Sequence, residues 1–472
     1  MKGHYIDGTW TGDEPSLPVE NPATGAIIAR VADADAAVGQ RALEAAAAAQ
    51  DKWARTSPRS RADLLMAVFG LLHERADRIA ALITAEMGKP LAEARGEVSY
   101  AAEFFRWFAE ESVRAAGGYR LAPSGTRRIV TMSQPVGPVL AITPWNFPLA
   151  MGARKIAPAL GAGCTIVLKP APQTPLTSLA LMELLDEAGV PAGVVNCVTT
   201  SDAAAVCTPL LADPRLRKLT FTGSTAVGRT LLALSAPRVL RTSMELGGNA
   251  PFVVLAHADL DKAVAGAVEA KMRNSGEACT SANRFLVHES LAEEFAARLT
   301  ERLAALRVGD GAEPGTQVGP LIDATAVASV ERLVDEAVRA GARVRTGGHR
   351  RPGPGYFFEP TVLTDVPADA RILHTEIFGP VAPIRTFFTT AEALAAANTT
   401  TAGLIGYVYG ENLNETLTFA ENLETGMVGV NAGVVSDPAA PFGGVKESGL
   451  GREGGREGLD EYLETKYLGL AL

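Results

Sequence analysis

Cys279 differs from the other cysteines of the chain, which has 4 in total, in the residues that precede it. It follows the polar run 274–277, whereas Cys164, Cys197 and Cys207 lie in or beside apolar segments. A thiolate is a strong nucleophile and later a good leaving group, so a cysteine in polar surroundings can carry out covalent catalysis. An isolated cysteine is more often a small buried hydrophobe, and we keep this interpretation for the other three. Cys279 is the candidate nucleophile.

Two further polar residues are of types that would support a reaction at this sulfur. Glu245 precedes Gly247 and Gly248, which let the backbone pass closely, and a carboxylate can activate water. Asn146 lies within the segment 144–148, and an amide can stabilise negative charge on an oxygen. Each also has a structural explanation when taken singly, because Glu245 can be a satisfied carboxylate at a strand end and Asn146 a turn residue.

The elements that must position these residues begin near Pro135. Helical stretches follow Pro148 and Pro175, and they alternate with short apolar runs typical of buried strands, at 136–142, 165–168, 194–198 and 218–221. This alternation predicts a parallel α/β sheet, since parallel strands need a crossover connection. A nucleotide-binding fold is the natural hypothesis. The glycine fingerprint G-x-G-x-x-G that usually opens such a domain is absent.

The segment 220–228 offers another way to bind a pyrophosphate. It has the order strand, Gly/Ser/Thr turn and helix start, with Gly223 and Ser224 in the turn. Backbone N–H groups and the positive end of a helix can hold an anion there. A plain turn between a strand and a helix explains the segment as well. Lys169 is predicted at the end of another strand, where a lysine is by itself usually a solvated charge.

A second α/β pattern begins near Gly247 and carries Cys279. It contains an apolar run at 250–255, a helical pattern at 260–268 and another at 291–299. Because a chain of 472 residues exceeds one ordinary core, and about 150 residues make a typical domain, we expect roughly three units.

Several motifs, taken in order, carry a resemblance to a known family. They are the segments 144–148, 169–170, 220–228, 244–249, 274–280 and 376–380. Together they resemble the aldehyde dehydrogenase superfamily over nearly the whole chain. The resemblance implies an α/β fold with a Rossmann-type cofactor domain (1–117 and 135–246), an α/β catalytic domain (247–440), and a small β oligomerisation element with the C-terminal tail (118–134 and 441–472).

The resemblance also assigns roles in the oxidation of an aldehyde to a carboxylic acid. Cys279 would form the covalent adduct and then a thioester, Asn146 and the backbone N–H of Cys279 would stabilise the oxyanion, and Glu245 would be the general base. For the cofactor, it implies Lys169 at the adenosine ribose and Glu376 at the nicotinamide ribose. The remaining cofactor-binding residues that it implies are Trp145, Gly223, Ser224 and Phe378.

The cofactor is expected to be NADP or NAD. Many relatives that prefer NAD carry a glutamate three residues after the lysine that matches Lys169, and here that position is Pro172. A carboxylate would accept a hydrogen bond from the ribose 2′-hydroxyl and repel a 2′-phosphate, whereas proline does neither. The missing carboxylate slightly favours NADP and leaves the choice open.

Within the superfamily the chain most resembles the succinate-semialdehyde dehydrogenases, through the segments 106–111, 154–155, 168–175 and 441–454. This likeness implies that Arg154, Arg273 and Ser436 bind the carboxylate of the substrate, a task that suits the planar fork of arginine. Ion pairing on a helix surface is the alternative for the arginines. Ser281 stands where some relatives have a second cysteine, so we expect no disulfide switch at this loop.

The bulk properties set limits on partners and location. The net charge of −9 is spread along the chain, which argues against nucleic acid and anionic membranes. The cysteines lack metal-ligand spacing, so no metal site is expected. Residues 1–15 lack the pattern of a secretory signal, and we expect a cytoplasmic homodimer or homotetramer whose subunits pair through the extended segment 127–132.

Three other functions remain open at this point. One is a dehydrogenase of glutarate semialdehyde or another ω-semialdehyde, and another is a dehydrogenase of an uncharged aldehyde. The third, of a different class, is a non-catalytic dinucleotide-binding or structural protein.

Overall fold

Eight strands form the first large sheet, and its central strands run parallel. In the computed structural model, which describes residues 3–12 and 16–471, their order is β2-β1-β9-β8-β7-β10-β11-β21. Part of the N-terminal segment 1–15 therefore lies outside the described residues. The strands are β1 (His4–Ile6), β2 (Thr9–Thr11), β7 (Val139–Ile142), β8 (Ile166–Lys169), β9 (Val195–Cys197), β10 (Lys218–Thr222), β11 (Arg241–Glu245) and β21 (Gly449–Leu450).

Helices cover both faces of this sheet, as its fully buried central strands require. Val139 and Ala141 of β7 belong to one core, and Leu140 and Ile142 to another, because successive strand residues point to opposite faces. Helices α2 to α6 line the first core, and α1, α7 and α8 the second. Their bounds are α1 (Ala36–Ala54), α2 (Pro58–Glu74), α3 (Ala76–Met87), α4 (Leu91–Ser112), α5 (Ala150–Ala162), α6 (Pro175–Glu187), α7 (Ala203–Ala212) and α8 (Thr225–Ser235).

The second large sheet has the order β14-β15-β16-β13-β12-β18-β19, and all neighbours except β14 and β15 are parallel. Its strands are β12 (Ala250–Val254), β13 (Ala282–His288), β14 (Arg343–Thr346), β15 (Thr361–Thr364), β16 (Val381–Phe387), β18 (Ile405–Tyr409) and β19 (Met427–Val430). Its helices are α9 (Leu260–Met272), α10 (Glu289–Ala304), α11 (Ala324–Arg339), α12 (Thr390–Asn398) and α13 (Leu413–Asn422). The fold is thus α/β, with two sheets whose strands are mainly parallel, as the sequence predicts.

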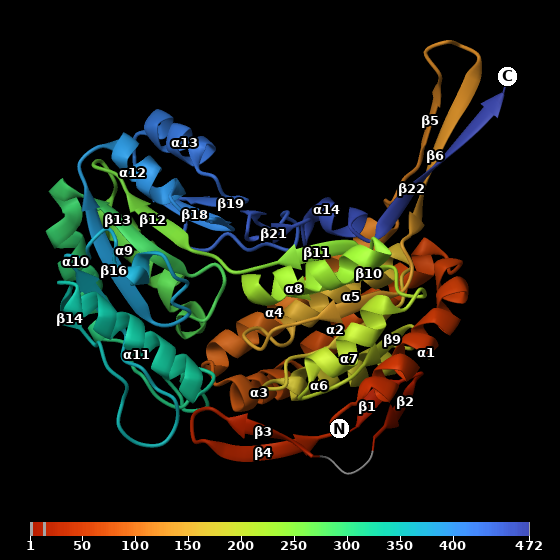
Figure 1. Cartoon of the computed structure of the whole chain (residues 1–472), viewed down its shortest axis with the longest axis horizontal. Helices are drawn as coiled ribbons and strands as arrows, with labels where there is room; N and C mark the ends of the chain where they lie inside the picture. Colours follow the sequence, from red (N-terminus) through yellow and green to blue (C-terminus); the bar gives the residue numbers. More distant parts are fainter. Residues whose placement is uncertain (1–2, 13–15, 472) are drawn as a thin grey trace.

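The two sheets lie in opposite halves of the molecule in Figure 1, and the short connection 246–249 joins β11 of the first to β12 of the second. The carboxyl ends of β7, β8, β10 and β11 lead to Asn146, Lys169, Ser224 and Glu245 respectively. The order of the first sheet reverses between β7 and β10, and the crevice outside the carboxyl ends at such a point is where α/β sheets bind ligands. On the opposite side, Cys279 precedes β13 and Glu376 precedes β16.

A three-stranded arm extends away from both sheets (Figure 1). It consists of β5 (Gly118–Leu121), β6 (Arg127–Pro135) and β22 (Leu463–Ala471), paired antiparallel in the order β22-β6-β5. Before the arm, two parts of the C-terminal segment pack on the first sheet and its helices: β21 pairs with β11, and α14 (Gly455–Asp460) packs on α4 and α5. Two small ribbons complete the fold, β3 (Leu17–Asn21) with β4 (Ala26–Val31) and β17 (Ala402–Gly403) with β20 (Val445–Lys446).

Within residues 3–12 and 16–471, none of the helices combines the length and apolar character needed to span a bilayer. The same residues contain no cluster of three or more histidine, cysteine, aspartate or glutamate side chains placed to hold a metal ion.

Candidate active site

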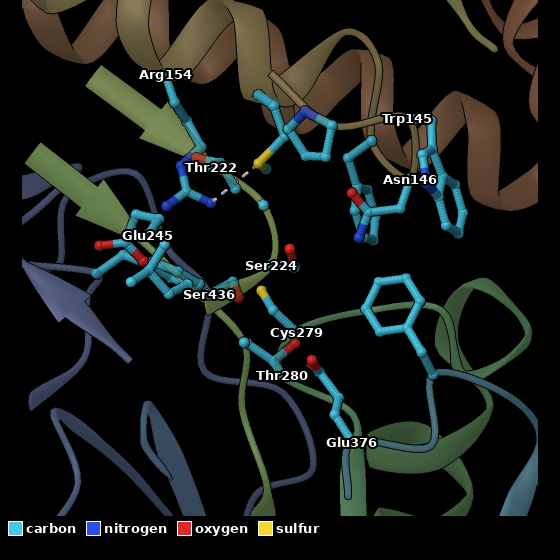
Figure 2. Close-up of a pocket in the computed structure, with 18 of the residues that line it drawn as sticks. Trp145, Asn146, Arg154, Thr222, Ser224, Glu245, Cys279, Thr280, Glu376 and Ser436 are labelled. Atoms are coloured by element: carbon cyan, nitrogen blue, oxygen red, sulfur yellow. Dashed lines mark hydrogen bonds between the residues drawn. The ribbon is translucent and has the colours of Figure 1, made fainter. Parts of the chain in front are cut away.

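A cavity of about 270 Å³ lies where the two sheets meet. Most of the site residues predicted from the sequence line it, namely Trp145, Asn146, Arg154, Gly223, Ser224, Glu245, Arg273, Cys279, Glu376, Phe378 and Ser436. Figure 2 shows Cys279 with Arg154 and Glu245 on one side and Trp145 and Glu376 on the other. Lys169 is the exception, since it is buried at the end of β8 and does not line this cavity.

The loop that presents Cys279 has an unusual backbone. Asn274, Ser275 and Gly276 are three consecutive residues in the left-handed region, with φ of 56°, 55° and 81°. A side chain at Gly276 would clash, since its Cβ would lie 2.2 Å from the carbonyl oxygen of Gly379. Such strain persists only where surrounding contacts fix it, and it is concentrated at functional sites.

Amide side chains supply those contacts and join the two halves of the site. Asn274 Nδ2 donates to the carbonyl oxygens of Asn146 (2.9 Å) and Glu277 (3.0 Å), and Asn146 Nδ2 donates to the same Glu277 oxygen at 3.0 Å. An amide nitrogen carries two hydrogens, so Asn146 retains a second donor on the cavity side of this junction. These hydrogen bonds therefore join the turn after β7 to the loop before β13, which carries Cys279.

A buried lysine secures the Asn146 turn from behind. Lys89 Nζ donates to the carbonyl oxygen of Asn146 at 2.8 Å and pairs with Glu97 Oε2 at 2.6 Å, with both side chains 1% exposed. Glu97 Oε1 accepts from the backbone N–H groups of Leu149 and Ala150 at the start of α5. A carboxylate is stabilised at a helix N-terminus, so the charge that balances Lys89 also anchors α5.

The Cys279 thiol lies in a buried environment crossed by opposing charges. Burial raises the pKa of Cys279 to about 12, the nearby Arg154 and Arg273 guanidinium groups act to lower it, and Glu245 and Glu376 act to raise it. In the ligand-free protein the thiol is therefore largely protonated near neutral pH, and the two arginines are the groups that favour the thiolate.

Glu245 is fully enclosed, and neither of its carboxyl oxygens has a hydrogen-bond partner among the described residues. Burial raises the pKa of Glu245 well above its usual value, and the Glu453 carboxylate adds to the rise, while Arg154, Lys155 and Arg452 oppose it. A carboxyl whose pKa is raised toward neutral pH can both accept and release a proton there, which suits a general acid or base.

Two guanidinium groups and several aromatic rings also face the cavity. Arg154 is 2% exposed, and its guanidinium lies 4.0 Å from the ring centroid of Phe442. Arg273 lies 5.1 Å from the ring of Phe147 and 6.0 Å from that of Tyr100. Two guanidinium groups facing one small cavity favour an anionic ligand.

The residues predicted to hold a dinucleotide are compatible with one. Ser224 caps α8, where it accepts from the N–H of Val227, and the first turn of this helix is exposed. Burial lowers the pKa of Lys169, and among the described residues its ammonium group makes no ion pair with a carboxylate. Burial raises the pKa of Glu376 to about 7, and its Oε1 accepts from Gly248 N–H at 3.1 Å. A Cβ at Gly247 would lie 2.7 Å from Glu376 Oε2, so glycine leaves the room that this carboxyl occupies.

Comparisons with known proteins identify the family of the chain. The model of the aldehyde dehydrogenase family matches residues 10–468. The chain belongs to the aldehyde dehydrogenase family. It is 57% identical to a succinate-semialdehyde dehydrogenase of Paenarthrobacter nicotinovorans, over 94% of this chain and 99% of the relative. A glutarate-semialdehyde dehydrogenase of Pseudomonas aeruginosa is 49% identical, over 98% of this chain and 96% of the relative. The crystal structure of an NADP-dependent enzyme of Escherichia coli superposes with a TM-score of 0.98 at 46% identity, covering 100% of this chain and 98% of that one.

Some residues of this aldehyde dehydrogenase site were not predicted from the sequence. Tyr100 and Phe442 line the cavity, Lys89 supports the Asn146 turn, and Lys155 and Glu453 form a buried ion pair behind Arg154. Lys155 and Glu453 are 298 residues apart, so no local pattern relates them. The adjacent basic pair Arg154 and Lys155 on a buried helix is the one signal that could have prompted a search for a buried counter-ion.

The first prediction concerns the pH dependence of Cys279 reactivity. Burial raises the pKa of this thiol to about 12. The thiolate fraction in the ligand-free enzyme should therefore grow about tenfold with each pH unit from about pH 7 to about pH 10. The rate of alkylation by iodoacetamide, followed by mass spectrometry of the Cys279 peptide, should rise without levelling off, and Cys279→Ala should remove the signal. A plateau near neutral pH would contradict this picture.

Proposed function

We propose that this enzyme oxidises short aldehydes that carry a second, anionic end, with succinate semialdehyde as the preferred substrate and the dicarboxylic acid as product. The observation that carries the proposal is that Arg154 and Arg273 line the same small cavity as Cys279. The relatives named for succinate semialdehyde and glutarate semialdehyde support it, since both of these compounds are aldehydes with a terminal carboxylate. Glutarate semialdehyde is one carbon longer and is the second candidate.

In the proposed first half-reaction, the Cys279 thiol loses its proton to water, and the thiolate Sγ attacks the aldehyde carbon to form a tetrahedral adduct. The negative charge that develops on oxygen is stabilised by the free Nδ2 hydrogen of Asn146 and by the backbone N–H of Cys279, and one such donor contributes roughly 3 kcal/mol. Loss of hydride from the adduct leaves a thioester on Cys279. The contacts of Asn274 and Lys89 fix the backbone of the Asn146 turn, so the donor is aimed before the charge appears.

In the second half-reaction, the thioester must be hydrolysed. Glu245 takes a proton from water, the resulting hydroxide attacks the thioester carbon, and the acid leaves as the thiol re-forms. Placement of Glu245 in the cavity that Cys279 faces supports this role. Its raised pKa makes it a stronger base, although a smaller fraction is ionised at neutral pH.

The residues compatible with a nicotinamide dinucleotide are Lys169, Ser224 and Glu376, with Trp145 and Phe378 in edge contact at 5.5 Å between ring centroids. When bound, this cofactor accepts the hydride removed from the aldehyde. Lys169 makes no ion pair with a carboxylate among the described residues, and the position three residues later is Pro172. Positive charge is therefore left for a ribose 2′-phosphate, and we infer that NADP is used at least as well as NAD.

We also propose the division of labour among the units. The first sheet with its helices, from 1–117 and 135–246, binds the cofactor, the second unit, 247–440, supplies the nucleophile, and the arm joins subunits into a homodimer or homotetramer. The arm supports an interface because its apolar side chains are exposed, among them Tyr119 (66%), Leu121 (57%) and Leu470 (48%). Free thiols at all four cysteines suit a reducing compartment such as the cytoplasm.

The proposed catalytic roles predict two different kinetic defects. Cys279→Ala should abolish aldehyde-dependent cofactor reduction, because no adduct can form. Glu245→Gln should retain a single rapid turnover per active site and then slow by about a hundredfold or more, because only thioester hydrolysis needs the base. Stopped-flow absorbance of the reduced cofactor separates the two. A Glu245→Gln enzyme that loses the rapid phase and the steady state equally would remove Glu245 from the second half-reaction.

The anionic-substrate proposal predicts a strong preference among aldehydes of equal length. Wild-type kcat/KM should be higher for succinate semialdehyde than for butanal by tenfold to a hundredfold, roughly the value of hydrogen bonds to a charged group. The preference should shrink in Arg273→Ala and should persist in the control Arg302→Ala, which changes an exposed arginine of α10. Equal wild-type rates on the two aldehydes would refute the proposal, and a higher rate on glutarate semialdehyde would make that compound the substrate.

The arm proposal predicts a change of mass in solution. The double variant Leu468→Lys and Leu470→Lys should bury charge in the subunit interface. It should therefore shift the protein toward the mass of a single chain in analytical ultracentrifugation. Lys466→Glu, at an already polar position of the same strand, is the control. An unchanged mass in the double variant, with the wild type oligomeric, would place the interface elsewhere.

A further inference from the structure

Glu453 lies directly behind the arginine assigned to the anionic end of the substrate. Its Oε2 is 2.7 Å from Arg154 Nη2, and the side chains are 5% and 3% exposed. Its Oε1 pairs with Lys155 Nζ, which also donates to Thr222 Oγ1 at 2.7 Å. One buried carboxylate therefore holds two adjacent cations of α5.

The contacts of Arg154 leave one edge of its guanidinium for a ligand. Nη2 faces Glu453, and the ring of Phe442 lies against the group at 4.0 Å from its centroid. Nη1 contacts Met151 Sδ at 3.8 Å, and a thioether sulfur is a weak acceptor that a carboxylate would replace. The ion pair with Glu453, a charge contact at 2.7 Å without hydrogen-bond geometry, and the ring of Phe442 hold the guanidinium in place, while Nη1 stays available in the cavity wall.

We propose that Glu453 is the positioning residue of the anion site, holding Arg154 in the orientation that receives the carboxylate of the substrate. This inference rests on the proposed function and adds a residue to it. Glu453 acts through Arg154 and does not touch the substrate.

The charge balance of the cluster agrees with such a role. Arg154 and Lys155 are both buried, and Glu453 compensates only one of the two positive charges. Burial acts to lower the pKa of Arg154, but the Glu453 carboxylate and neighbouring acidic groups together outweigh this effect and raise it. The Arg154 guanidinium therefore stays charged next to the cavity and can bind an anionic substrate. Without Glu453, two adjacent buried cations would repel each other, and Arg154 would lose the partner that sets its direction.

Glu453 also acts through its charge on the carboxyl proposed as the general base. The charged groups that act most strongly on Glu245 are Glu453, Arg154, Lys155 and Arg452, and among these four Glu453 is the negative one and raises the pKa of Glu245. Removing its charge should move the rise of the hydrolysis rate with pH toward lower pH. A side chain that only supported packing would not produce this shift.

The test compares kcat/KM for succinate semialdehyde and butanal in four enzymes, namely the wild type, Glu453→Gln, Arg154→Ala and the double variant. In Glu453→Gln the preference for the semialdehyde should fall about tenfold, mainly through KM, with butanal little affected. In the Arg154→Ala background the same substitution should not change the preference further. Glu447→Gln is the matched control, because Glu447 lies on the same segment and pairs with the exposed Arg229.

Thermal unfolding and NADP binding establish that each variant is folded. If Glu453→Gln does not fold, Glu453→Asp tests the same claim, because it keeps the charge and withdraws the carboxylate from Arg154. The preference should then fall while the pH profile stays near that of the wild type. An unchanged or increased preference, or an equal fall with and without Arg154, would overturn the role of Glu453. A wild type without any preference would instead refute the proposed substrate.

Discussion

The main-chain carbonyl of Glu277 is the point on which the site depends, because two amide side chains from opposite sides converge on it. Asn146, from the turn after β7 of the first sheet, and Asn274, from the loop before β13 of the second, both donate to this oxygen at 3.0 Å. The junction holds three consecutive left-handed residues in place and thereby fixes where Cys279 lies. Asn274 also donates to the carbonyl oxygen of Asn146 at 2.9 Å, so two direct hydrogen bonds join the turn after β7 to the Cys279 loop.

A second constraint comes from the return of the chain to the first sheet. After β19, residues 436–453 pass back along the cavity, where Ser436 lines the wall and Phe442 and Glu453 contact Arg154 of α5. The proposed substrate end of the site is thus assembled from three distant parts of the sequence. The buried cations of α5 require this arrangement, because a charge without a partner is costly in a protein interior.

Local pattern was sufficient to predict much of this architecture. The four apolar runs between residues 136 and 221 are β7 to β10, and the Gly/Ser/Thr turn is the capped start of α8. Alternation of buried strands with helices carries that information within a few residues. The motifs also pointed to residues that line one cavity, although Lys169 lies outside it, at the end of β8.

Contacts between distant segments could not be predicted in this way. Lys89 supports Asn146 across 57 residues, and Lys155 meets Glu453 across 298, so neither leaves a periodic signal in the sequence. The positive φ of Asn274 and Ser275 was equally hidden, because these residue types are compatible with an ordinary helix end as well as with a strained loop. Only the tertiary fold determines which of these conformations is adopted.

The most direct test of the central claim is to trap the covalent intermediate. Glu245→Gln enzyme, mixed with NADP and succinate semialdehyde and quenched in acid, should carry one acyl group per chain, and peptide mass spectrometry should locate it on Cys279. An acyl group on another residue, or none while the reduced cofactor accumulates, would contradict the account.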